Sequence, residues 1–264
     1  MRQPILIMGI VNITPDSFSD GGQFFAADEA VGRALQLQEE GADIIDLGAE
    51  STRPGHTPVS MDEEWQRLEP VLRAVCGRLR VRISVDTYKP EIARRALAMG
   101  VDMVNDVSGA QCSESMLELV AKAHCDYVWM HNRPVEPTGD GLSELFAETR
   151  MGVERCLRAG IAQNRLWIDP GIGFAKTHDQ NLQALRALPE FAKLGPQVLL
   201  GISRKRVVGG VLGLPVDSRL EGSLAGVAYA VAAGVRAVRV HDVQASVRVA
   251  RMMEAMVAED AVVS

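Results

Sequence analysis

The chain has 264 residues, of which 47% are hydrophobic and 23% charged, a composition typical of soluble globular proteins. Its formal net charge is −6 and no segment concentrates lysine and arginine, so we expect neither nucleic acid nor an anionic membrane as a partner. The longest apolar stretch, Leu224 to Val235, is too short to span a bilayer and predicts a buried helix.

Four cysteines lie far apart in the sequence: Cys76, Cys112, Cys125 and Cys156. None forms a C-x-x-C pair and none has a histidine at metal-ligand spacing, so we expect reduced thiols in a cytoplasmic protein. The amino terminus has an apolar run without a small-residue cleavage site, and we therefore do not interpret it as a signal peptide.

The first strand is predicted at Ile5–Val11, an apolar run rich in β-branched residues that stops at Asn12. The polar stretch from Thr14 to Gly22 contains a proline and ends in two glycines, which predicts a loop. Further short apolar runs, each ending in polar residues, predict seven more strands: Ile44–Leu47, Val81–Val85, Met103–Val104, Tyr127–Met130, Leu166–Ile168, Val198–Ile202 and Ala237–Val240.

Segments with helical periodicity separate these strands. Ser60 with Glu63 predicts a capping box at the start of one helix, and Pro70 predicts a kink or break within it. Ser218 with Glu221 predicts a second capping box, ahead of the most apolar helix.

A strand followed by a helix, repeated eight times, predicts an α/β fold of the (β/α)8 TIM-barrel type, with residues 1–264 as a single domain. Three helix-to-strand junctions also resemble one another: GADIID at 41–46, GVDMVN at 100–105 and GVRAVR at 234–239. The rival architecture is a doubly wound open sheet, which usually carries a phosphate loop near its start. No G-x-G-x-x-G follows the first strand, and this favours the barrel.

Polar or ionisable side chains follow every predicted strand. Catalytic residues of such barrels come from the carboxyl ends of the strands, so we expect all of these groups at one mouth. Taken alone each is weak evidence, because Asp86 could cap a helix and His241 could be a structural histidine. Together they predict a functional site.

The side chains at this mouth form two chemical groups. The first combines carboxylates, an amide and an ammonium: Asp86, Asn105, Asp169 and Lys205. Carboxylates in a partly dry pocket accept paired hydrogen bonds, so this group suits a flat heterocycle with several N–H donors. The second combines two arginines, a histidine and an amide: Asn12, Arg53, Arg239 and His241. It suits a diphosphate, with Asn12 and loop carboxylates such as Asp20 as oxygen ligands for magnesium.

Seven motifs resemble, in order, those of the dihydropteroate synthases: MGIVNITPDSFSDGG at 8–22, STRPG at 51–55, SVDT at 84–87, NDVSG at 105–109, DPGIGF at 169–174, SRK at 203–205 and RVHD at 239–242. The resemblance runs from about residue 5 to residue 250. It implies a transferase of folate biosynthesis, the target of sulfonamides. That enzyme condenses (7,8-dihydropterin-6-yl)methyl diphosphate with p-aminobenzoate to give 7,8-dihydropteroate and diphosphate.

The resemblance also implies roles for individual residues. The pterin would contact Asp86, Asn105, Asp169 and Lys205, between walls formed by Met130, Phe174 and Gly201. Diphosphate would contact Asn12, Arg53, Arg239 and His241, with Mg²⁺ bound at Asn12. p-Aminobenzoate would lie among Phe18, Thr52, Pro54, Ser203 and the stem of Lys205. The catalytic residues are expected to be Asp86, Lys205 and Arg53. The family is dimeric, which implies a homodimer.

A dissociative, SN1-like displacement fits this arrangement. Arginines and magnesium would meet the charge that develops on the departing diphosphate, and Asp86 would stabilise the pterin methylene cation that the neutral arylamine attacks. The loops after the first two strands would close over the site and exclude water. We expect the segment from Thr14 to Gly22 to be the least ordered part of an unliganded structure.

Two alternatives remain at this point. A corrinoid-type pterin-binding methyltransferase shares the barrel and the pterin pocket but needs neither the diphosphate-holding arginines nor the two long loop motifs. A non-catalytic pterin-binding homologue would lack the diphosphate site. The chain departs from the family after Met130-His131, where it reads Asn132-Arg133-Pro134, so the fifth loop, to Arg150, is expected to be remodelled.

Overall fold

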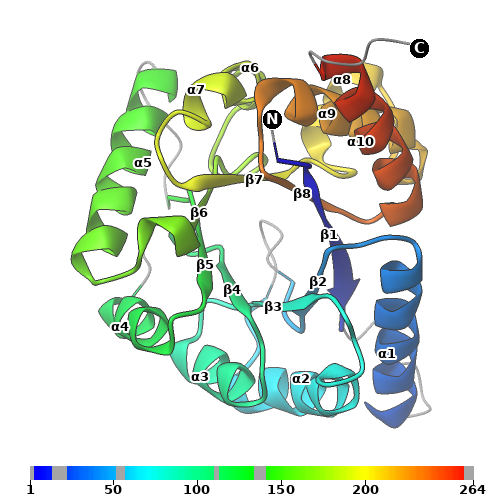
Figure 1. The fold of residues 1–264 in the computed structure, drawn as a ribbon, viewed down its shortest axis with the longest axis vertical. Coiled ribbons are helices and arrows are strands. Elements are labelled where there is room, and N and C mark those ends of the chain that lie inside the picture. The colour runs from blue at the N-terminus through cyan, green and yellow to red at the C-terminus, as the bar shows by residue number, and fades with distance from the viewer. Residues whose placement is uncertain (1–2, 14–22, 52–56, 110–112, 134–140, 259–264) are drawn as a thin grey trace.

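The structure is a computed structural model that describes residues 3–13, 23–51, 57–109, 113–133 and 141–258. Parallel strands close into a barrel in sequence order, and β8 pairs with β1 (Figure 1). Their bounds are β1 Leu6–Asn12, β2 Ile44–Gly48, β3 Arg82–Asp86, β4 Met103–Asp106, β5 Asp126–Met130, β6 Leu166–Asp169, β7 Gln197–Gly201 and β8 Ala237–Val240. Every strand lies within two residues of its predicted position. The (β/α)8 barrel is confirmed, and the open sheet is wrong because the ring of strands closes.

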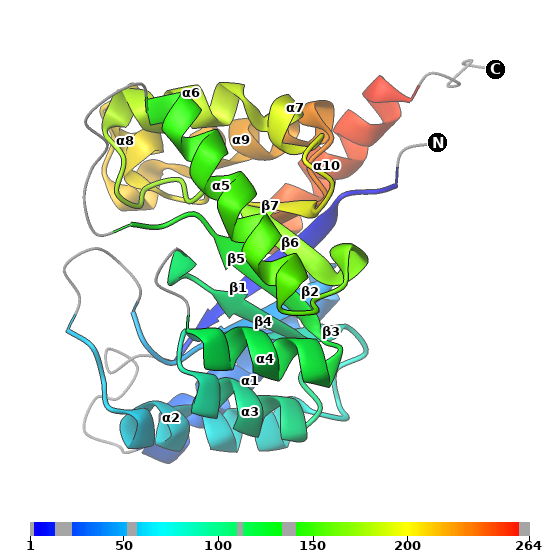
Figure 2. The same cartoon turned by 90° about the vertical axis from the view of Figure 1, so that its left-hand side faces the viewer.

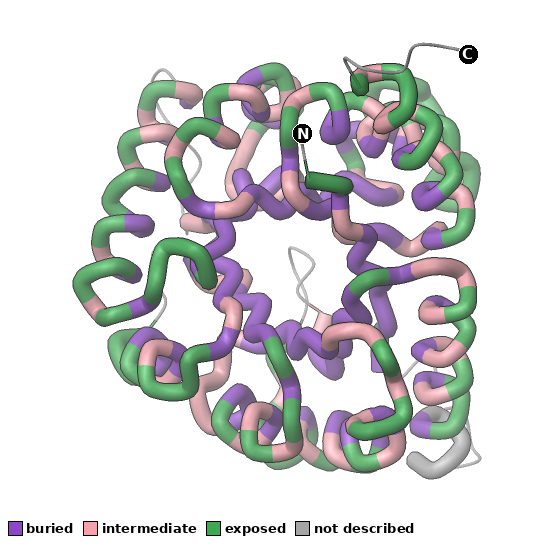
Figure 3. Tube along the Cα trace, viewed as in Figure 1, coloured by how far each residue is buried: buried purple, intermediate pink, exposed green. Residues whose placement is uncertain are grey.

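Helices form a ring around the strands (Figure 1). In the side view the strands lie in the middle of the molecule, with helices on either side of them (Figure 2). Their bounds are α1 Gln23–Glu39, α2 Met61–Val75, α3 Pro90–Ala98, α4 Glu114–Ala123, α5 Gly141–Arg158, α6 His178–Arg186, α7 Leu188–Phe191, α8 Arg206–Leu212, α9 Leu220–Ala233 and α10 Val243–Val257. Burial concentrates on the strands and on the inward sides of the helices (Figure 3). Apolar side chains from seven strands fill the barrel interior: Met8, Ile44, Met103, Val128, Trp167, Leu199 and Ala237. The barrel is thus a packed core with its polar groups at the ends.

Two of the three similar helix-to-strand junctions have a common structural role. Asp43 and Asp102 each follow a glycine at φ +99° and reach back to the preceding strand of the barrel. Asp43 Oδ2 accepts a hydrogen bond from the Ile7 amide at 2.8 Å, and Asp102 Oδ2 accepts one from the Ile83 amide at 2.8 Å. These carboxylates cap the amino ends of strands, so they belong to the face of the barrel opposite the predicted site.

Helix α2 tests the predicted break at Pro70 and the predicted capping box at Ser60. The helix runs from Met61 to Val75 without a break at Pro70, because that proline lies on the exposed face and the buried Val71, Leu72 and Val75 hold the turn after it in place. Ser60 does cap the helix, accepting from the Glu63 amide at 3.1 Å. The Glu63 carboxylate pairs with Arg67, so only half of the predicted capping box forms.

Two further predictions concern the apolar helix α9. The predicted capping box is wrong, because Ser218 belongs to a 3₁₀ turn and the N-cap residue, Arg219, makes no side-chain capping bond. The helix is also only half-buried: Val227 is inaccessible, whereas Tyr229 is 42% exposed. No described helix is long and apolar enough to cross a membrane. Cys76, Cys125 and Cys156 form no disulfide among the described residues, and Cys112 lies outside them.

A buried ionic cluster joins the segments on either side of residues 52–56. The ammonium of Lys89, which precedes α3, contacts the carboxylates of Glu50 at 2.5 Å and Glu64 at 2.6 Å. It also donates to the Val59 carbonyl at 2.8 Å. Glu50 lies two residues after β2 and Val59 two residues before α2, so one cation connects both segments to the start of α3.

Replacing Lys89 with methionine is expected to lower the free energy of unfolding by about 3–5 kcal/mol, because it removes the cation from two buried carboxylates. Urea denaturation with matched m-values measures this loss. Lys122→Met is the control, since Lys122 is 80% exposed and its ion pair with Glu118 is a surface pair. Equal stability of the two variants would contradict the expected importance of the cluster.

Candidate active site

The predicted site residues that end β3, β4 and β8 lie together. Arg239 extends across the barrel mouth, where its Nε donates to Asp46 Oδ2 at 2.6 Å and an Nη donates to Asp86 Oδ2 at 2.7 Å. Asn105 is in register with Asp86 and donates its amide to Asp46 Oδ2 at 3.2 Å. Asp46 lies inside the second predicted strand, one residue before its end, and was not among the predicted site residues. It holds both Arg239 and Asn105 in place.

Burial perturbs the carboxyl group of Asp86. Burial raises its pKa to about 7, although the guanidinium of Arg239 acts in the opposite direction. Its second oxygen, Oδ1, is buried and has no hydrogen-bond partner among the described residues, and the same is true of Asp46 Oδ1. An unpaired buried acceptor is costly, so these two atoms indicate where the donors of a ligand would bind.

Lys205 and Asp169 form the second half of the site. Lys205 Nζ donates to the Ile172 carbonyl at 2.5 Å and lies 5.0 Å from the centre of the Phe174 ring. Burial lowers the pKa of Lys205 to about 8, and Asp169 opposes this shift. Burial likewise raises the pKa of Asp169, with Lys205 as the main opposing charge. A methyl group at Gly201 would lie 3.3 Å from Lys205 Nζ and 3.5 Å from Asp169 Oδ2, so the glycine leaves space beside both charges.

The remaining described site residues lie at neighbouring strand ends. Met130 is buried at the end of β5, in register with Asp169. Ser203 Oγ lies 3.1 Å from His241 Nδ1, which connects the segments after β7 and β8. Asn12 is exposed at the end of β1, in register with Gly48. The mouth therefore combines a buried polar floor with an exposed amide at its rim.

Several predicted positions cannot be placed. Thr52, Arg53 and Pro54 lie outside the described residues, as do Phe18 and the whole segment from Thr14 to Gly22. The prediction that this segment is the least ordered therefore stays a prediction.

Sequence reasoning missed a second basic residue beside the site, which is partly buried. Lys176 follows the DPGIGF motif by two residues and contacts both that motif and His131. The sequence did contain a signal for Lys176, because a lysine follows the glycine-rich turn at the end of a predicted strand.

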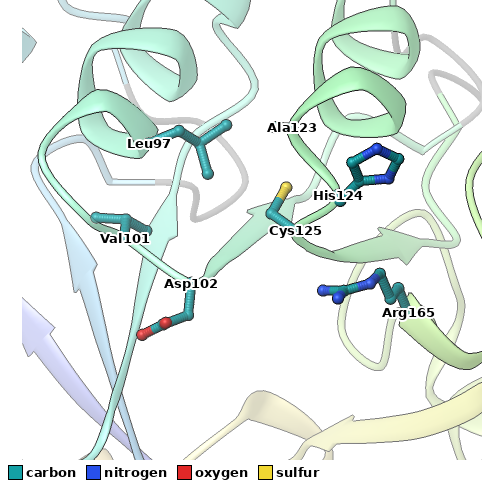
Figure 4. A pocket seen from close by; sticks show the side chains of 7 residues that line it. All are labelled: Leu97, Val101, Asp102, Ala123, His124, Cys125 and Arg165. Atoms are coloured by element: carbon teal, nitrogen blue, oxygen red, sulfur yellow. The ribbon is translucent and has the colours of Figure 1, made fainter.

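A cavity of about 250 Å³ lies elsewhere, between the residues that precede β4, β5 and β6 (Figure 4). Its lining includes Asp102, His124, Cys125 and Arg165. It is at the amino ends of the strands, where Asp102 already caps Ile83, and it contains none of the predicted site residues.

Comparison with known proteins identifies the family. The profile of the pterin binding enzymes matches residues 8–241. The dihydropteroate synthase of Bacillus subtilis is 44% identical over 97% of this chain and 90% of its own. The dihydropteroate synthase structure from Clostridium difficile, solved with pteroic acid, has a TM-score of 0.92 at 42% identity and covers 97% of each chain. That of Xanthomonas albilineans, solved with 4-aminobenzoic acid, has a TM-score of 0.92 at 41% identity, covering 97% of this chain and 94% of that one.

A further solved relative, the Yersinia pestis dihydropteroate synthase in complex with a sulfonamide drug, has a TM-score of 0.88 at 37% identity and covers 96% of this chain and 94% of that one. These relatives do not favour the corrinoid-type methyltransferase. The barrel, the polar mouth and the similarity over nearly the whole chain agree: the chain belongs to the pterin-binding enzyme family, as one of its dihydropteroate synthases.

Proposed function

We propose that the barrel mouth condenses (7,8-dihydropterin-6-yl)methyl diphosphate with p-aminobenzoate, giving 7,8-dihydropteroate and diphosphate, and that residues 1–264 act as one domain. The observation that carries this proposal is the buried Asp86, whose Oδ1 has no partner among the described residues while Arg239 holds its other oxygen. A buried acceptor beside a guanidinium suits a donor-rich heterocycle with an anionic substituent. Relatives solved with pteroic acid and with 4-aminobenzoic acid support the same choice of ligands.

The pterin is proposed to lie on the buried floor of the mouth. Its N–H groups would donate to the carboxylates, its ring oxygen and nitrogens would accept from the amide and the ammonium, and apolar groups would cover its faces. The proposed contacts are Asp86, Asn105, Asp169 and Lys205, with Met130, Phe174 and Gly201 as walls. Burial in a partly dry site strengthens each of these hydrogen bonds.

The diphosphate is proposed to bind toward the rim, with Arg239 and His241 among its contacts. Arg53 and Asn12 would complete this half of the site, with Ser203 and Thr52 beside the p-aminobenzoate. Asn12 fits magnesium as a single exposed oxygen donor, because Mg²⁺ prefers oxygen ligands, keeps several waters and takes further oxygens from phosphates. The described residues contain no cluster of three carboxylate, histidine or cysteine ligands, which agrees with a metal held largely by substrate. When bound there, magnesium would neutralise charge on the diphosphate.

The proposed reaction is dissociative. Fixed positive groups stabilise the charge that develops on diphosphate as its bond to the pterin methylene breaks. The ionised Asp86 lies on the buried side of the site and stabilises the resulting cation, which the neutral arylamine then attacks. Lys205 orients the pterin through its ammonium and frames p-aminobenzoate with its methylene stem.

Turnover tests this proposal directly. The full chain, mixed with the pterin diphosphate, Mg²⁺ and p-aminobenzoate, is expected to release diphosphate and form dihydropteroate in equal amounts. Omission of either substrate is the control and should abolish both signals. A folded protein that forms no dihydropteroate would refute the proposed function.

We also propose that the chain is a cytoplasmic homodimer. Four large apolar side chains around the end of α8 are exposed: Val211, Leu212, Leu214 and Val216, at 37–59%. A contiguous apolar segment of this kind is typical of an interface with a second copy. Sedimentation at micromolar concentration should give twice the chain mass, and Val211→Glu combined with Leu214→Glu should give the monomer.

Gly201→Ala is expected to weaken binding of the diphosphate-free pterin alcohol by about tenfold, because the added methyl narrows the space beside Lys205 and Asp169. Isothermal titration measures the affinity. The matched control is Gly32→Ala, where an added methyl meets no atom within 4 Å and binding should be unchanged. Unchanged affinity in the Gly201 variant would place the pterin elsewhere.

A further inference from the structure

Lys176 holds the turn that connects β6 to α6. Its ammonium donates to the Gly171 carbonyl at 3.0 Å and to the Phe174 carbonyl at 3.1 Å, and lies 2.9 Å from His131 Nδ1. An ammonium has three N–H donors, and these three acceptors use all of them. Lys176 is therefore fully engaged by the protein and has no donor left for a ligand.

The turn itself needs such support because its backbone is irregular. Gly171 has φ +68°, Gly173 has φ +86° and Ala175 has φ +43°, the last being a left-handed conformation that is unfavourable for a residue with a Cβ atom. Such a backbone cannot join a helix or a strand ladder, so its polar groups need other partners.

Side chains supply these partners at each residue from 171 to 174. Lys176 holds the first and last carbonyls, and Lys205 holds the Ile172 carbonyl at 2.5 Å. The Gly173 amide donates to Asn181 Oδ1 at 2.6 Å, and the Asn181 amide in turn donates to the Lys176 carbonyl at 3.2 Å. The conformation of the turn thus depends on these polar side chains together with one backbone hydrogen bond, which the Phe174 amide donates to the Gly171 carbonyl at 3.1 Å.

His131 and Glu148 fix Lys176 from the other side. His131 is 1% exposed, and burial followed by the charge of Lys176 lowers its pKa to about 4. The neutral imidazole accepts from Lys176 at Nδ1, so its proton is on Nε2, which lies 2.6 Å from Glu148 Oε2. Arg133 also donates to Glu148, at 2.8 Å. The array connects the outer helix α5 to the β6–α6 turn.

The turn carries two of the proposed pterin contacts. Asp169 Oδ1 accepts from the Gly171 amide at 2.7 Å, so the rotation of that carboxylate depends on where Gly171 lies. Phe174 places its ring beside the ammonium of Lys205. We propose that Lys176 is a positioning residue for the pterin site, which fixes the turn at 171–174 and thereby orients the Asp169 carboxylate and the Phe174 ring. This inference rests on the proposed function, because it assigns both side chains to the pterin.

The first test is the affinity of Lys176→Met for the diphosphate-free pterin alcohol, measured by isothermal titration. Methionine keeps the length and apolar stem of lysine but removes all three donors. We expect the dissociation constant to rise 10- to 100-fold, with kcat at saturating substrates reduced by less than that. Arg82→Met is the matched control, because it removes an ion-paired cation at the opposite end of the barrel, and it should bind like the wild type.

A double-mutant cycle with Asp169→Asn separates positioning from a general loss of stability. If Lys176 acts through Asp169, the double variant should bind at least fivefold better than the product of the two single effects predicts. The proposal would be overturned if the loss of affinity in the double variant equals the product of the two single losses to within twofold. It would also be overturned if Lys176→Met binds the pterin alcohol with an affinity within twofold of that of the wild type.

Glu148→Met provides a second route if Lys176→Met does not fold. Glu148 is partly exposed on the outer helix, so its loss should be tolerated, and among the described residues it connects to the turn through His131 and Lys176. A pterin affinity at least threefold weaker supports the proposal, and an unchanged affinity overturns it. If the wild type itself fails to bind the pterin alcohol, the proposed function fails. If the wild type binds and turns over while the variants behave like it, only this inference fails.

Discussion

Asp86→Asn is expected to lower kcat by about 10²- to 10³-fold, the usual loss when one preorganised charge is removed from a transition state. The amide keeps the shape of the side chain but cannot oppose the positive charge that develops on the pterin methylene. Affinity for the pterin alcohol should fall much less, because the neutral ligand carries no such charge. Steady-state kinetics and titration of the same preparations compare the two effects.

Asp102→Asn is the matched control for this variant. It makes the same substitution in a strand-associated aspartate at the other end of the barrel, where Oδ2 accepts from the Ile83 amide and the asparagine oxygen can do the same. Its turnover should stay within about twofold of the wild type. If the loss of kcat/KM in Asp86→Asn matched its loss of pterin affinity, Asp86 would be a binding residue only.

The same aspartate should make stability depend on pH. Burial raises the pKa of Asp86 to about 7. A carboxyl whose pKa is raised on folding stabilises the fold while protonated, and this contribution disappears as the pH rises from the unfolded pKa, about 4, through the folded value. Asp86→Asn stays neutral, so its stability relative to the wild type should increase by on the order of 2–3 kcal/mol between pH 5 and 8. Urea titrations at intervals of one pH unit measure the difference, and a constant difference would contradict the raised pKa of Asp86.

The strands were predictable from the sequence because each is a short apolar run that stops at a polar residue. The same stop positions identified Asp86, Asn105 and Asp169, since parallel strands of a barrel all end at one mouth. Local rules failed where tertiary contacts decide the outcome. Pro70 predicted a kink or break in α2, and the break is wrong because the exposed side of a packed helix tolerates the proline. Ser218 has the spacing of a cap but lies in a 3₁₀ turn.

The connections between site residues could not be predicted from the sequence. Arg239 pairs with carboxylates 193 and 153 residues away, and Lys176 meets a histidine 45 residues away. A motif identifies which residues approach a ligand, but it does not show which of them hold one another before the ligand arrives. For Arg239 this difference changes the expected result of mutation.

Arg239→Met is expected to weaken binding of both pterin ligands, and not only that of the diphosphate. A guanidinium that served the diphosphate alone would leave the pterin alcohol unaffected when removed. In the structure, however, Arg239 is the common cation of Asp46 and Asp86, which are 0% and 5% exposed. Its loss leaves two buried carboxylates without that partner, at an expected cost of about 3–5 kcal/mol in stability. It also raises the pKa of Asp86 further, because Arg239 is the main charge that opposes the shift.

A second substitution separates the two roles of Arg239. In Arg239→Met combined with Asp46→Asn, one of the competing carboxylates is neutral, so Asp86 regains part of its ionised form and the fold part of its stability. Affinity for the pterin alcohol should recover to within about fivefold of the wild-type value. Affinity for the pterin diphosphate should stay at least 30-fold weaker than in the wild type, because no cation replaces the guanidinium. Titration of both ligands against the single and double variants measures this difference. Recovery of both ligands in the double variant would show that Arg239 organises the floor of the site without holding the diphosphate.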